Sequence, residues 1–301
     1  MDVIPYIHAA TSNNTRKAYQ ADIRHFIQFG GLLPANIDML QLYLSAHAEK
    51  LNPRTLVRRL TAIKQWHITQ GFPDPTSHPM LRKLLTGIKN VHGKPKDKAP
   101  PLTLDALTQI VEHLEQSGKL IDHRNNALLQ LGFFGAFRRS ELVVLTWEQI
   151  TFFPEGMEVL LPRSKTDQAG EGQICAIPYG NKELCAVRAL IRWQEHCQQT
   201  AGAIFCHVPI CEPTTAIKDN QVNQIMKSSA MASGLPEPFA YSSHSLRRGF
   251  ATEASKKGAP FGAIMRQGRW RHEGTVLGYI EEGKRFDSNA VDVMLQSNEN
   301  K

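Results

Sequence analysis

A segment with no periodic hydrophobic pattern, HGKPKDKAPPLT at residues 92–103, interrupts this chain of 301 residues about one third of the way along. Its three prolines and three lysines favour extended, solvated backbone over a helix or a strand. One hydrophobic core cannot continue through such a segment, and the chain is long enough for two cores. We therefore predict a helical domain over residues 1–93, a linker over 94–102 and a second domain over 103–301.

The positive charge of the chain is concentrated before this boundary. Residues 1–100 contain 14 Lys and Arg against 6 Asp and Glu, whereas residues 101–301 contain 21 against 22. A concentrated positive field suits a polyanionic partner, because each cation set against a phosphate releases condensed counterions. A solvated basic surface that only aids solubility is the alternative. We favour a nucleic acid as the partner of the first domain.

Several classes of protein are excluded by the rest of the composition. No stretch approaches the ~20 apolar residues that a membrane span requires. The N-terminal sequence has no basic segment followed by an apolar core, which argues against a secretory signal. The five cysteines are an odd number and do not resemble a disulfide framework. We expect no membrane partner and a cytoplasmic location, with the favoured nucleic-acid partner placing the protein at the nucleoid.

Amphipathic periodicity predicts that the first domain is helical. Apolar residues recur at helical spacing over 15–29, in a second run that opens at Asp38, in a third that starts near Pro53 and in a short fourth around 80–91. Short helices of this kind bury their apolar stripes only against one another, so they form a bundle. On the third helix, the candidates for DNA binding are Arg54, Arg58, Arg59 and Lys64.

The second domain is predicted to be helical around one β-hairpin. The runs MEVLLP and GQICAIPY are short and rich in β-formers, and the polar, glycine-containing sequence RSKTDQAGEG separates them. The fold class is therefore mainly α with a small β-hairpin, an α+β domain behind a helical bundle. The expected helices of this domain cover residues 106–115, 122–134, 184–198, 221–232, 246–256 and 261–267.

Two polar segments of the second domain carry basic residues in defined positions. Arg138 and Glu141 follow a very apolar helix and are three residues apart, which places them on one face of a helix. Taken alone, this spacing slightly favours a surface ion pair, which is common and weakly stabilising. Lys165 lies in the polar sequence between the two predicted strands, where a lysine is ordinarily just solvated.

Two further segments place cations and aromatic rings near the C-terminal end. His244 and Arg247 are also three residues apart, and each cation disfavours the other unless an anion lies between them. A phosphate is such an anion, and an arginine can grip it with two parallel hydrogen bonds. Trp270 and Tyr279 are nine residues apart, so they converge only if the segment bends. A tyrosine is most often a core or rim aromatic, but it is also a nucleophile where cations stabilise its phenolate.

In order and spacing, these segments together resemble the tyrosine recombinases, the phage integrase family. The resemblance covers residues 103–282, and the basic bundle before the linker is similar to the core-binding domain of that family. Tryptophan at position 270 and the turn sequence RSKTDQAGEG look most similar to the Cre-like branch. Each motif is weak by itself, but five in the right order are specific. The five are the Arg138 and Glu141 pair, Lys165, the His244 and Arg247 pair, Trp270 and Tyr279.

The resemblance implies that Arg138 and Arg247 clamp the scissile phosphate of DNA and stabilise its pentacoordinate transition state. It implies that Tyr279 is the nucleophile, which attacks the phosphorus and leaves a 3′-phosphotyrosine and a free 5′-hydroxyl. Glu141 takes a supporting role and orients His244 or the arginines. In-line phosphoryl transfer depends on positioning and charge neutralisation, which two arginines supply.

The remaining catalytic roles also come from the resemblance. Lys165 matches the residue that protonates the leaving 5′-oxygen, and His244 matches the residue that accepts the tyrosine proton. Trp270 donates only through its indole N–H, so it can hydrogen-bond a phosphate oxygen but cannot shuttle protons. No cluster of carboxylates suggests a bound Mg²⁺, and we expect no metal and no cofactor.

The resemblance further implies an assembly on DNA. The partner is double-stranded DNA with inverted half-sites, and the active species is a homotetramer on two paired sites. The tail contains a short apolar stripe, which either packs within the chain or docks into a neighbouring protomer as an exchanged C-terminal helix. We favour docking into a neighbouring protomer. The stripe consists of Phe286, Ala290, Val291 and Met294.

Three other functions compete with site-specific recombination. A DNA-binding protein of the same fold could have lost cleavage, and a type IB topoisomerase-like enzyme shares the chemistry but relaxes supercoils as a monomer. A metal-dependent hydrolase is the most distant of the three, because the spacing of the cluster on which it depends fits no regular zinc finger. That cluster consists of Cys197, Cys206, His207 and Cys211.

Overall fold

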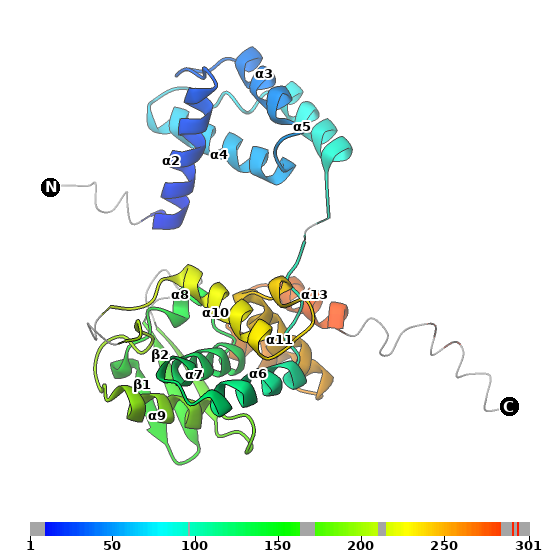
Figure 1. Ribbon diagram of the computed structural model, residues 1–301. Coiled ribbons are helices and arrows are strands. Elements are labelled where there is room, and N and C mark those ends of the chain that lie inside the picture. Colours follow the sequence, from blue (N-terminus) through cyan, green and yellow to red (C-terminus); the bar gives the residue numbers. More distant parts are fainter. Residues whose placement is uncertain are drawn as a thin grey trace. The chain divides into compact units, whose positions relative to one another are not determined.

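The structure, a computed structural model, consists of two compact units, residues 1–97 and 98–301 (Figure 1). It describes residues 10–95, 97–162, 172–209 and 215–283, together with Val291 and Met294. The predicted proton donor Lys165 lies outside the described residues, as do Cys211, Phe286 and Ala290.

The first unit is a bundle of four described helices whose starts are capped by side chains. Ser12 accepts a hydrogen bond from the amide of Thr15, and Asn36 accepts one from the amide of Met39. The second helix therefore begins just before Asp38, because Asn36 satisfies its first free amides. The helices are α2 (Asn13–Gln28), α3 (Ile37–His47), α4 (Pro53–Thr69) and α5 (Pro79–His92). Their shared core is centred on Phe26, Leu40, Tyr43, Leu44, Leu56, Ile63 and Leu81.

His67 completes the apolar stripe of α4 and is fully buried. Its Nε2 accepts a hydrogen bond from the amide of Ala35 at 2.8 Å, and its Nδ1 lies 2.8 Å from the carbonyl oxygen of Ile63. Since Nε2 accepts, the ring proton is on Nδ1 and is donated to Ile63. His67 is therefore a core residue that ties α4 to the loop before α3.

The basic candidates on α4 differ in their exposure. Arg54 is exposed, and the side chains of Arg58 and Lys64 are 51% and 44% exposed. The side chain of Arg59 is only 11% exposed, and its Nη1 donates to the hydroxyl of Tyr43 at 3.1 Å. Arg59 points into the bundle because neighbours on a helix diverge by about 100°. Arg59 therefore does not lie on the solvent-exposed side of α4 with Arg54, Arg58 and Lys64. For those three residues, a contact with DNA stays a prediction.

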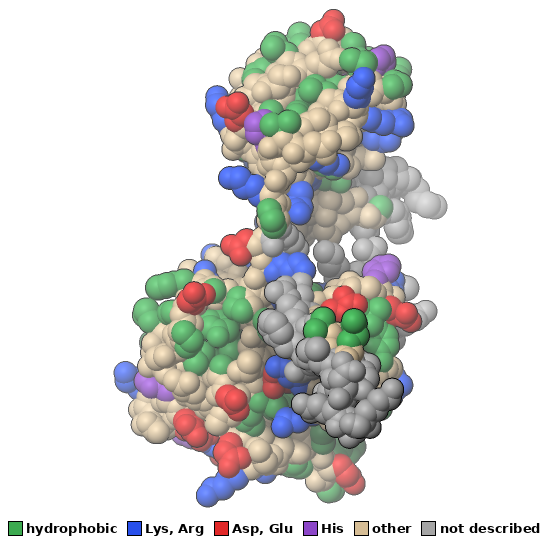
Figure 2. All heavy atoms as spheres, turned by 90° about the vertical axis from the view of Figure 1, so that its right-hand side faces the viewer, with side chains coloured by type: hydrophobic (Ala, Val, Ile, Leu, Met, Phe, Trp, Pro, Cys, Tyr) green, Lys and Arg blue, Asp and Glu red, His purple; other side chains and the backbone are tan. Residues whose placement is uncertain are grey.

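The surface of the two units differs in charge, as the composition indicates. On the face shown in Figure 2, the first unit (top) carries many blue Lys and Arg side chains and few red Asp and Glu side chains, whereas the second unit shows both colours interspersed. Part of the positive charge is paired inside its own unit, since Lys64 lies 3.0 Å from the carboxylate of Asp74.

Asp22 anchors α4 to α2 through a buried ion pair. It is 2% exposed and accepts two hydrogen bonds from Arg58, at 2.8 and 2.9 Å, while Arg59 lies 3.5 Å away. The side-chain hydrogen bond to Asp22 raises the pKa of Arg58, although partial burial opposes the shift. The carboxylate therefore compensates the guanidinium groups of both Arg58 and Arg59.

Replacing Asp22 with asparagine is expected to destabilise the first unit by about 2 kcal/mol, because the largely buried Arg59 loses its counterion, whereas the half-exposed Arg58 regains water. Urea unfolding followed by circular dichroism measures the effect. Asp38→Asn is the matched control, since Asp38 is exposed at the start of α3. Equal losses in the two variants would contradict the assignment of Asp22 as a structural anchor.

The second unit is helical around one small antiparallel sheet, which confirms the predicted fold class. The sheet has the order β1-β2-β3, and β2 and β3 form the predicted hairpin. A third strand, β1, is added at the outer side of β2. The strands are β1 (Ile150–Phe153), β2 (Gly156–Leu161) and β3 (Gln173–Pro178), and the 3₁₀ helices are η1 (Trp147–Gln149) and η2 (Pro238–Ala240). The helices are α6 (Leu104–Ser117), α7 (Leu120–Phe134), α8 (Arg139–Leu142), α9 (Ala186–Cys197), α10 (Asp219–Ala232), α11 (Ser243–Lys256), α12 (Phe261–Gly268) and α13 (Glu273–Gly283).

The central element of this unit is α7, which contacts α6, α8, α9 and α11 (Figure 1). Every residue from Arg124 to Phe133 is buried, which a helix achieves only when neighbours cover all of its sides. Several polar groups on it have internal partners, as in the hydrogen bond of Arg124 to the carbonyl of Cys206 at 3.0 Å. This rigid support ends at Gly135, where the site begins.

The end of the predicted linker belongs to the second unit. Leu102 is fully buried, and its amide donates to the carbonyl of Ser245 on α11 at 3.0 Å. Thr103 then caps α6 by accepting a hydrogen bond from the amide of Ala106. Contacts divide the chain between Asp97 and Lys98, so the final residues of the expected 94–102 linker are attached to α11. Within the described part of the chain, no helix is both long and apolar enough to cross a membrane.

Candidate active site

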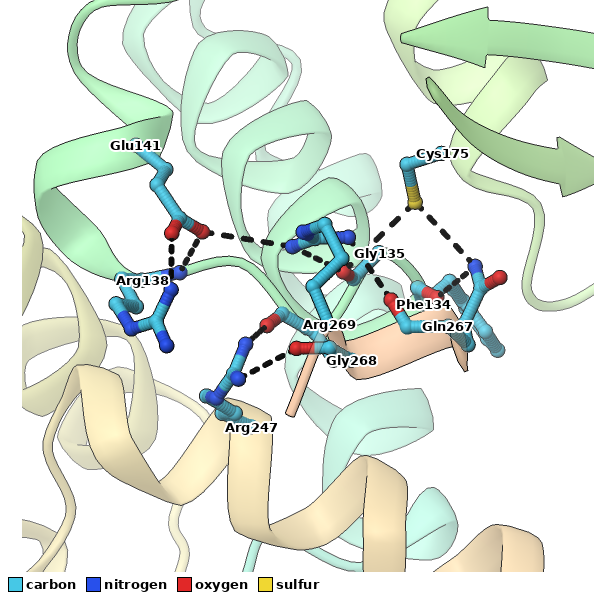
Figure 3. A network of polar contacts seen from close by, with 10 residues as sticks. Phe134, Gly135, Arg138, Glu141, Cys175, Arg247, Gln267, Gly268 and Arg269 are labelled. Atoms are coloured by element: carbon cyan, nitrogen blue, oxygen red, sulfur yellow. Dashed lines mark hydrogen bonds and ion pairs between the residues drawn. The ribbon is translucent and has the colours of Figure 1, made fainter. Parts of the chain in front are cut away.

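The first element of the site is the turn from α7 into α8, where Arg138 occupies the N-cap position. The Arg138 amide donates to Oε2 of Glu141 at 2.9 Å, and its Nη1 donates to Oε1 of the same carboxylate at 2.5 Å (Figure 3). The side chain of Glu141 is only 4% exposed. The carboxylate therefore lies in the interior and Arg138 is partly buried, so the pair is not the fully exposed surface ion pair that its spacing slightly favours.

A second arginine, Arg269, reaches the same carboxylate from the end of α12. Its Nη2 lies 3.4 Å from Oε2 of Glu141 and donates to the carbonyl of Gly135 at 3.1 Å. Its guanidinium carbon lies 4.5 Å from the ring centroid of Phe137. The backbone of Arg269 is left-handed, with φ of 52°, and this conformation ends α12 and turns the side chain inward. Sequence reasoning missed Arg269, because nothing distinguishes it from the exposed Arg271 in the same run.

The charges of these neighbours determine the ionisation of Glu141. Burial alone would raise the pKa of its carboxyl, but the backbone amide of Arg138 and the guanidinium groups of Arg269 and Arg138 together lower it. Glu141 is therefore an ionised carboxylate at neutral pH. Its two oxygens hold Arg138 and Arg269 at fixed positions on either side.

Arg247 lies on α11 and links the other parts of the site. It is 5% exposed, and its two terminal nitrogens donate to the carbonyls of Ala136 and Gly268, the latter at 2.5 Å (Figure 3). Its guanidinium carbon lies 4.2 Å from the ring centroid of Trp270. Burial and the nearby guanidinium groups of Arg138 and Arg269 lower the pKa of Arg247 to about 9, so it stays protonated at neutral pH.

The chain bends between α12 and α13, and the bend brings Trp270 and Tyr279 together. Their ring centroids are 6.3 Å apart, in an edge-to-face arrangement. The left-handed residue Arg269 starts the bend, and α13 begins only at Glu273. On a straight helix, residues nine apart would lie on opposite faces. The bend instead brings the two aromatic rings to one side. Tyr279 is half-buried and its backbone carbonyl accepts a hydrogen bond from Thr252 Oγ1 at 3.1 Å.

His244 is exposed in the first turn of α11, three residues before Arg247. Its amide donates to the hydroxyl oxygen of Ser242, which caps this helix. The helix thus holds His244 and Arg247 in one rigid element. Described residues from α8, α11, the bend after α12 and α13 therefore bring Arg138, Arg247, Trp270 and Tyr279 into one neighbourhood, with His244 at its edge.

The cysteine and histidine cluster does not form a metal centre within the part of the chain that the structure describes. Cys197 and Cys206 are both buried, and burial raises the pKa of each thiol, so they are neutral. His207, the next residue after Cys206, is exposed. Among the described residues, no group of three or more His, Cys, Asp or Glu could hold a metal ion.

Comparison with known proteins agrees with this architecture. Residues 101–285 match the phage integrase family. The chain is 36% identical over 299 residues to an integrase/recombinase XerD homolog of Selenomonas ruminantium, and the match covers 96% of this chain and 87% of that protein. The XerH site-specific recombinase bound to a palindromic difH substrate, a post-cleavage complex, has the same fold, with a TM-score of 0.64 at 16% identity over 94% of this chain and 78% of that one.

A lambda integrase tetramer bound to a Holliday junction also shares the fold, with a TM-score of 0.64 at 14% identity over 93% of this chain and 76% of that one. The family match and the relative of 36% identity define the class of this chain, which is that of the DNA strand transferases called tyrosine recombinases. The chain belongs to the phage integrase family and is a tyrosine-type site-specific recombinase. The resemblance drawn from the polar segments is thereby confirmed, while the Cre-like branch stays a prediction.

Proposed function

We propose that this enzyme cleaves and rejoins DNA through a covalent 3′-phosphotyrosine on Tyr279, with the scissile phosphate held by Arg138 and Arg247. The observation that carries this proposal is the position of Arg247. Its guanidinium donates to the carbonyls of Ala136 and Gly268 and stacks on Trp270, so it joins the segments that contain Arg138 and Tyr279.

The electrostatics of the site support the binding of a phosphate. Three guanidinium groups, from Arg138, Arg247 and Arg269, surround the single carboxylate of Glu141. Like charges that share a buried site repel one another unless an anion lies between them. A phosphodiester supplies that anion, and its transition state spreads charge over oxygens that arginine forks can contact.

The remaining steps of the reaction follow from the chemistry of phosphoryl transfer. The Tyr279 oxygen forms a bond to phosphorus while the bond from phosphorus to the 5′-oxygen breaks. We assign acceptance of the tyrosine proton to His244 and protonation of the leaving 5′-oxygen to Lys165. Trp270 donates its indole N–H to a phosphate oxygen, and Glu141 positions Arg138. The phosphotyrosine conserves the energy of the phosphodiester, so rejoining needs no ATP.

The first unit is proposed to bind the DNA duplex. Its net positive charge neutralises phosphates, with Arg54, Arg58 and Lys64 as candidate contacts. Of the four original candidates, Arg59 is the least suited, since it is engaged with Asp22 and Tyr43 inside the bundle. We propose inverted half-sites, each bound by one protomer.

We propose that four protomers assemble on two paired sites. The structural similarity to a lambda integrase tetramer supports this assembly. We further propose that the C-terminal tail is exchanged between protomers. Val291 and Met294, the described members of its apolar stripe, are 56% and 71% exposed and are thus suited to burial against another chain.

Covalent trapping tests the proposed chemistry. Nicked fragments that cover the DNA around the enzyme's own gene are incubated with the protein and quenched in SDS, and the DNA that stays bound is sequenced. Tyr279→Phe keeps the ring but removes the nucleophile, so we expect adducts with the native enzyme and none with this variant. Both proteins should shift the same fragments in a gel, since the aromatic ring is unchanged.

The outcomes separate the alternatives. Adducts that persist in Tyr279→Phe would eliminate Tyr279 as the nucleophile. Sequence-specific binding by both proteins with no adduct from either would favour a DNA-binding protein of the same fold. Gel filtration of the DNA complex separates a tetrameric recombinase from a monomeric, topoisomerase-like enzyme.

A further inference from the structure

One face of α11 carries a set of buried residues that the proposed chemistry does not use. Ser245, Arg248, Gly249 and Thr252 are spaced at helical intervals of three and four residues, so they lie on one face. All four are buried. The adjacent Arg247 faces the site described above. One face of α11 therefore contributes Arg247 to the candidate active site. The other face contacts different parts of the same unit.

The N-terminal half of this face holds the chain that leads in from the first unit. Leu102 donates its amide to the carbonyl of Ser245, and Nη1 of Arg248 donates to the carbonyl of Ala99. At Gly249, a Cβ atom would lie 2.1 Å from the carbonyl oxygen of Leu102, so only glycine permits this close approach. The segment from Ala99 to Leu102 is thus fastened to α11 at both ends.

The two residues between these fastenings are Pro100 and Pro101. Proline restricts its own φ and the conformation of the residue before it, so this short segment is stiff. A displacement at Ala99 is therefore transmitted along the segment rather than absorbed within it.

The C-terminal half of the same face holds the tyrosine. Thr252 Oγ1 donates to the backbone carbonyl of Tyr279 at 3.1 Å. The guanidinium carbon of Arg248 lies 5.4 Å from the ring centroid of Tyr279, within the range of a cation–π contact. Arg248 is 6% exposed and is thus a buried group that touches both the incoming chain and the aromatic ring.

We propose that Arg248 is a positioning residue that couples the path of residues 99–102 to the orientation of the Tyr279 ring. This inference rests on the proposed role of Tyr279 as the nucleophile. With the Ala99 carbonyl in place, the guanidinium is held over the ring and restricts its rotation. When the chain ahead of Ala99 is pulled away, Arg248 loses that acceptor and the ring gains freedom. DNA engagement by the first unit thereby acts on the rate of cleavage.

The test compares Arg248→Gln with the native enzyme in single-turnover cleavage of a nicked DNA fragment at saturating protein. We expect the cleavage rate to fall about tenfold, the effect of a lost contact of this kind, with DNA affinity changed less than about threefold. Lys257→Gln removes one positive charge from the exposed end of the same helix and is the matched control. Arg248→Lys keeps the positive charge and can still donate a hydrogen bond, so it should recover part of the cleavage rate.

A second measurement reports on the chain rather than on activity. Hydrogen exchange at the Leu102 amide should accelerate in Arg248→Gln, because the segment loses one of its two fastenings. Replacing Pro100 and Pro101 with glycine leaves Arg248 intact but removes the stiffness between Ala99 and Leu102. This variant should also slow cleavage without weakening DNA binding.

Each outcome decides one point. A native cleavage rate in Arg248→Gln would overturn the positioning role, and a native rate in the glycine variant would overturn the coupling to the incoming chain. If Tyr279→Phe still forms adducts, it is the proposed function that fails, whatever Arg248 does. Should Arg248→Gln prove unfolded by circular dichroism, the glycine variant still decides the coupling.

Discussion

Replacing Arg247 with lysine is expected to slow DNA strand cleavage by about 10²–10³-fold, comparable with the loss of one oxyanion donor in other enzymes. Lysine keeps the positive charge but lacks the planar fork that donates to Ala136 and Gly268 and stacks on Trp270. A compact ammonium cannot hold those carbonyls and a phosphate together. Single-turnover cleavage of a nicked fragment measures the rate.

The matched control for this prediction is Arg266→Lys on α12, where the arginine is exposed. It makes the same chemical change outside the site and should cleave at the native rate. DNA affinity is measured in parallel, because Arg247 is proposed to contact one phosphate and the first unit to supply most of the DNA contacts. A native rate in Arg247→Lys would show that charge alone suffices at this position.

The second large effect is on stability. Glu141→Gln is expected to destabilise the second unit by about 3 kcal/mol at pH 7, because the buried Arg269 and the partly buried Arg138 lose their shared counterion. For a unit of this size, such a loss lowers the melting temperature by roughly 6–12 °C. Glu155→Gln is the control, since Glu155 lies exposed in the turn between β1 and β2. Equal melting temperatures for Glu141→Gln and the native enzyme would contradict the role of Glu141.

The pH dependence of this effect has a definite sign. Although burial opposes it, the surrounding amide and guanidinium groups place the pKa of Glu141 below its ordinary value of 4.5. A carboxyl with a lowered pKa stabilises the fold fully above its unfolded-state pKa, and this stabilisation is lost as the pH falls through the folded-state value. The difference between native and Glu141→Gln should thus be constant near neutrality and shrink below about pH 4.5.

Sequence patterns predict most helices of both units because helical periodicity is local, but they do not predict the short α8 or α13. They also predicted the pairing of Arg138 with Glu141, since residues three apart meet on a helix. The burial of that pair depends on Arg269, which is 128 residues away from Glu141, so no local pattern reports it. Likewise β1 was not expected, because four residues offer too little alternation to mark a strand.

The positions on α4 show the same limit in another form. Four basic residues close in sequence form one candidate set, although a helix distributes neighbours around its axis. Whether such a residue faces solvent or the interior depends on partners from other helices, such as Tyr43 of α3, to which Arg59 donates. Arg59 and Arg58 are adjacent in sequence but differ in exposure for this reason.

The surplus of positive charge around Glu141 also has a consequence for solution conditions. Any small polyanion that enters among the three arginines stabilises the folded enzyme by mass action, since it binds the native state and not the unfolded chain. If the proposed function holds, the same ion competes with the scissile phosphate. Salts of sulfate or phosphate therefore act on this enzyme in two opposed ways, as preservatives of the fold and as inhibitors of the reaction, in addition to the general screening that weakens every protein–DNA contact.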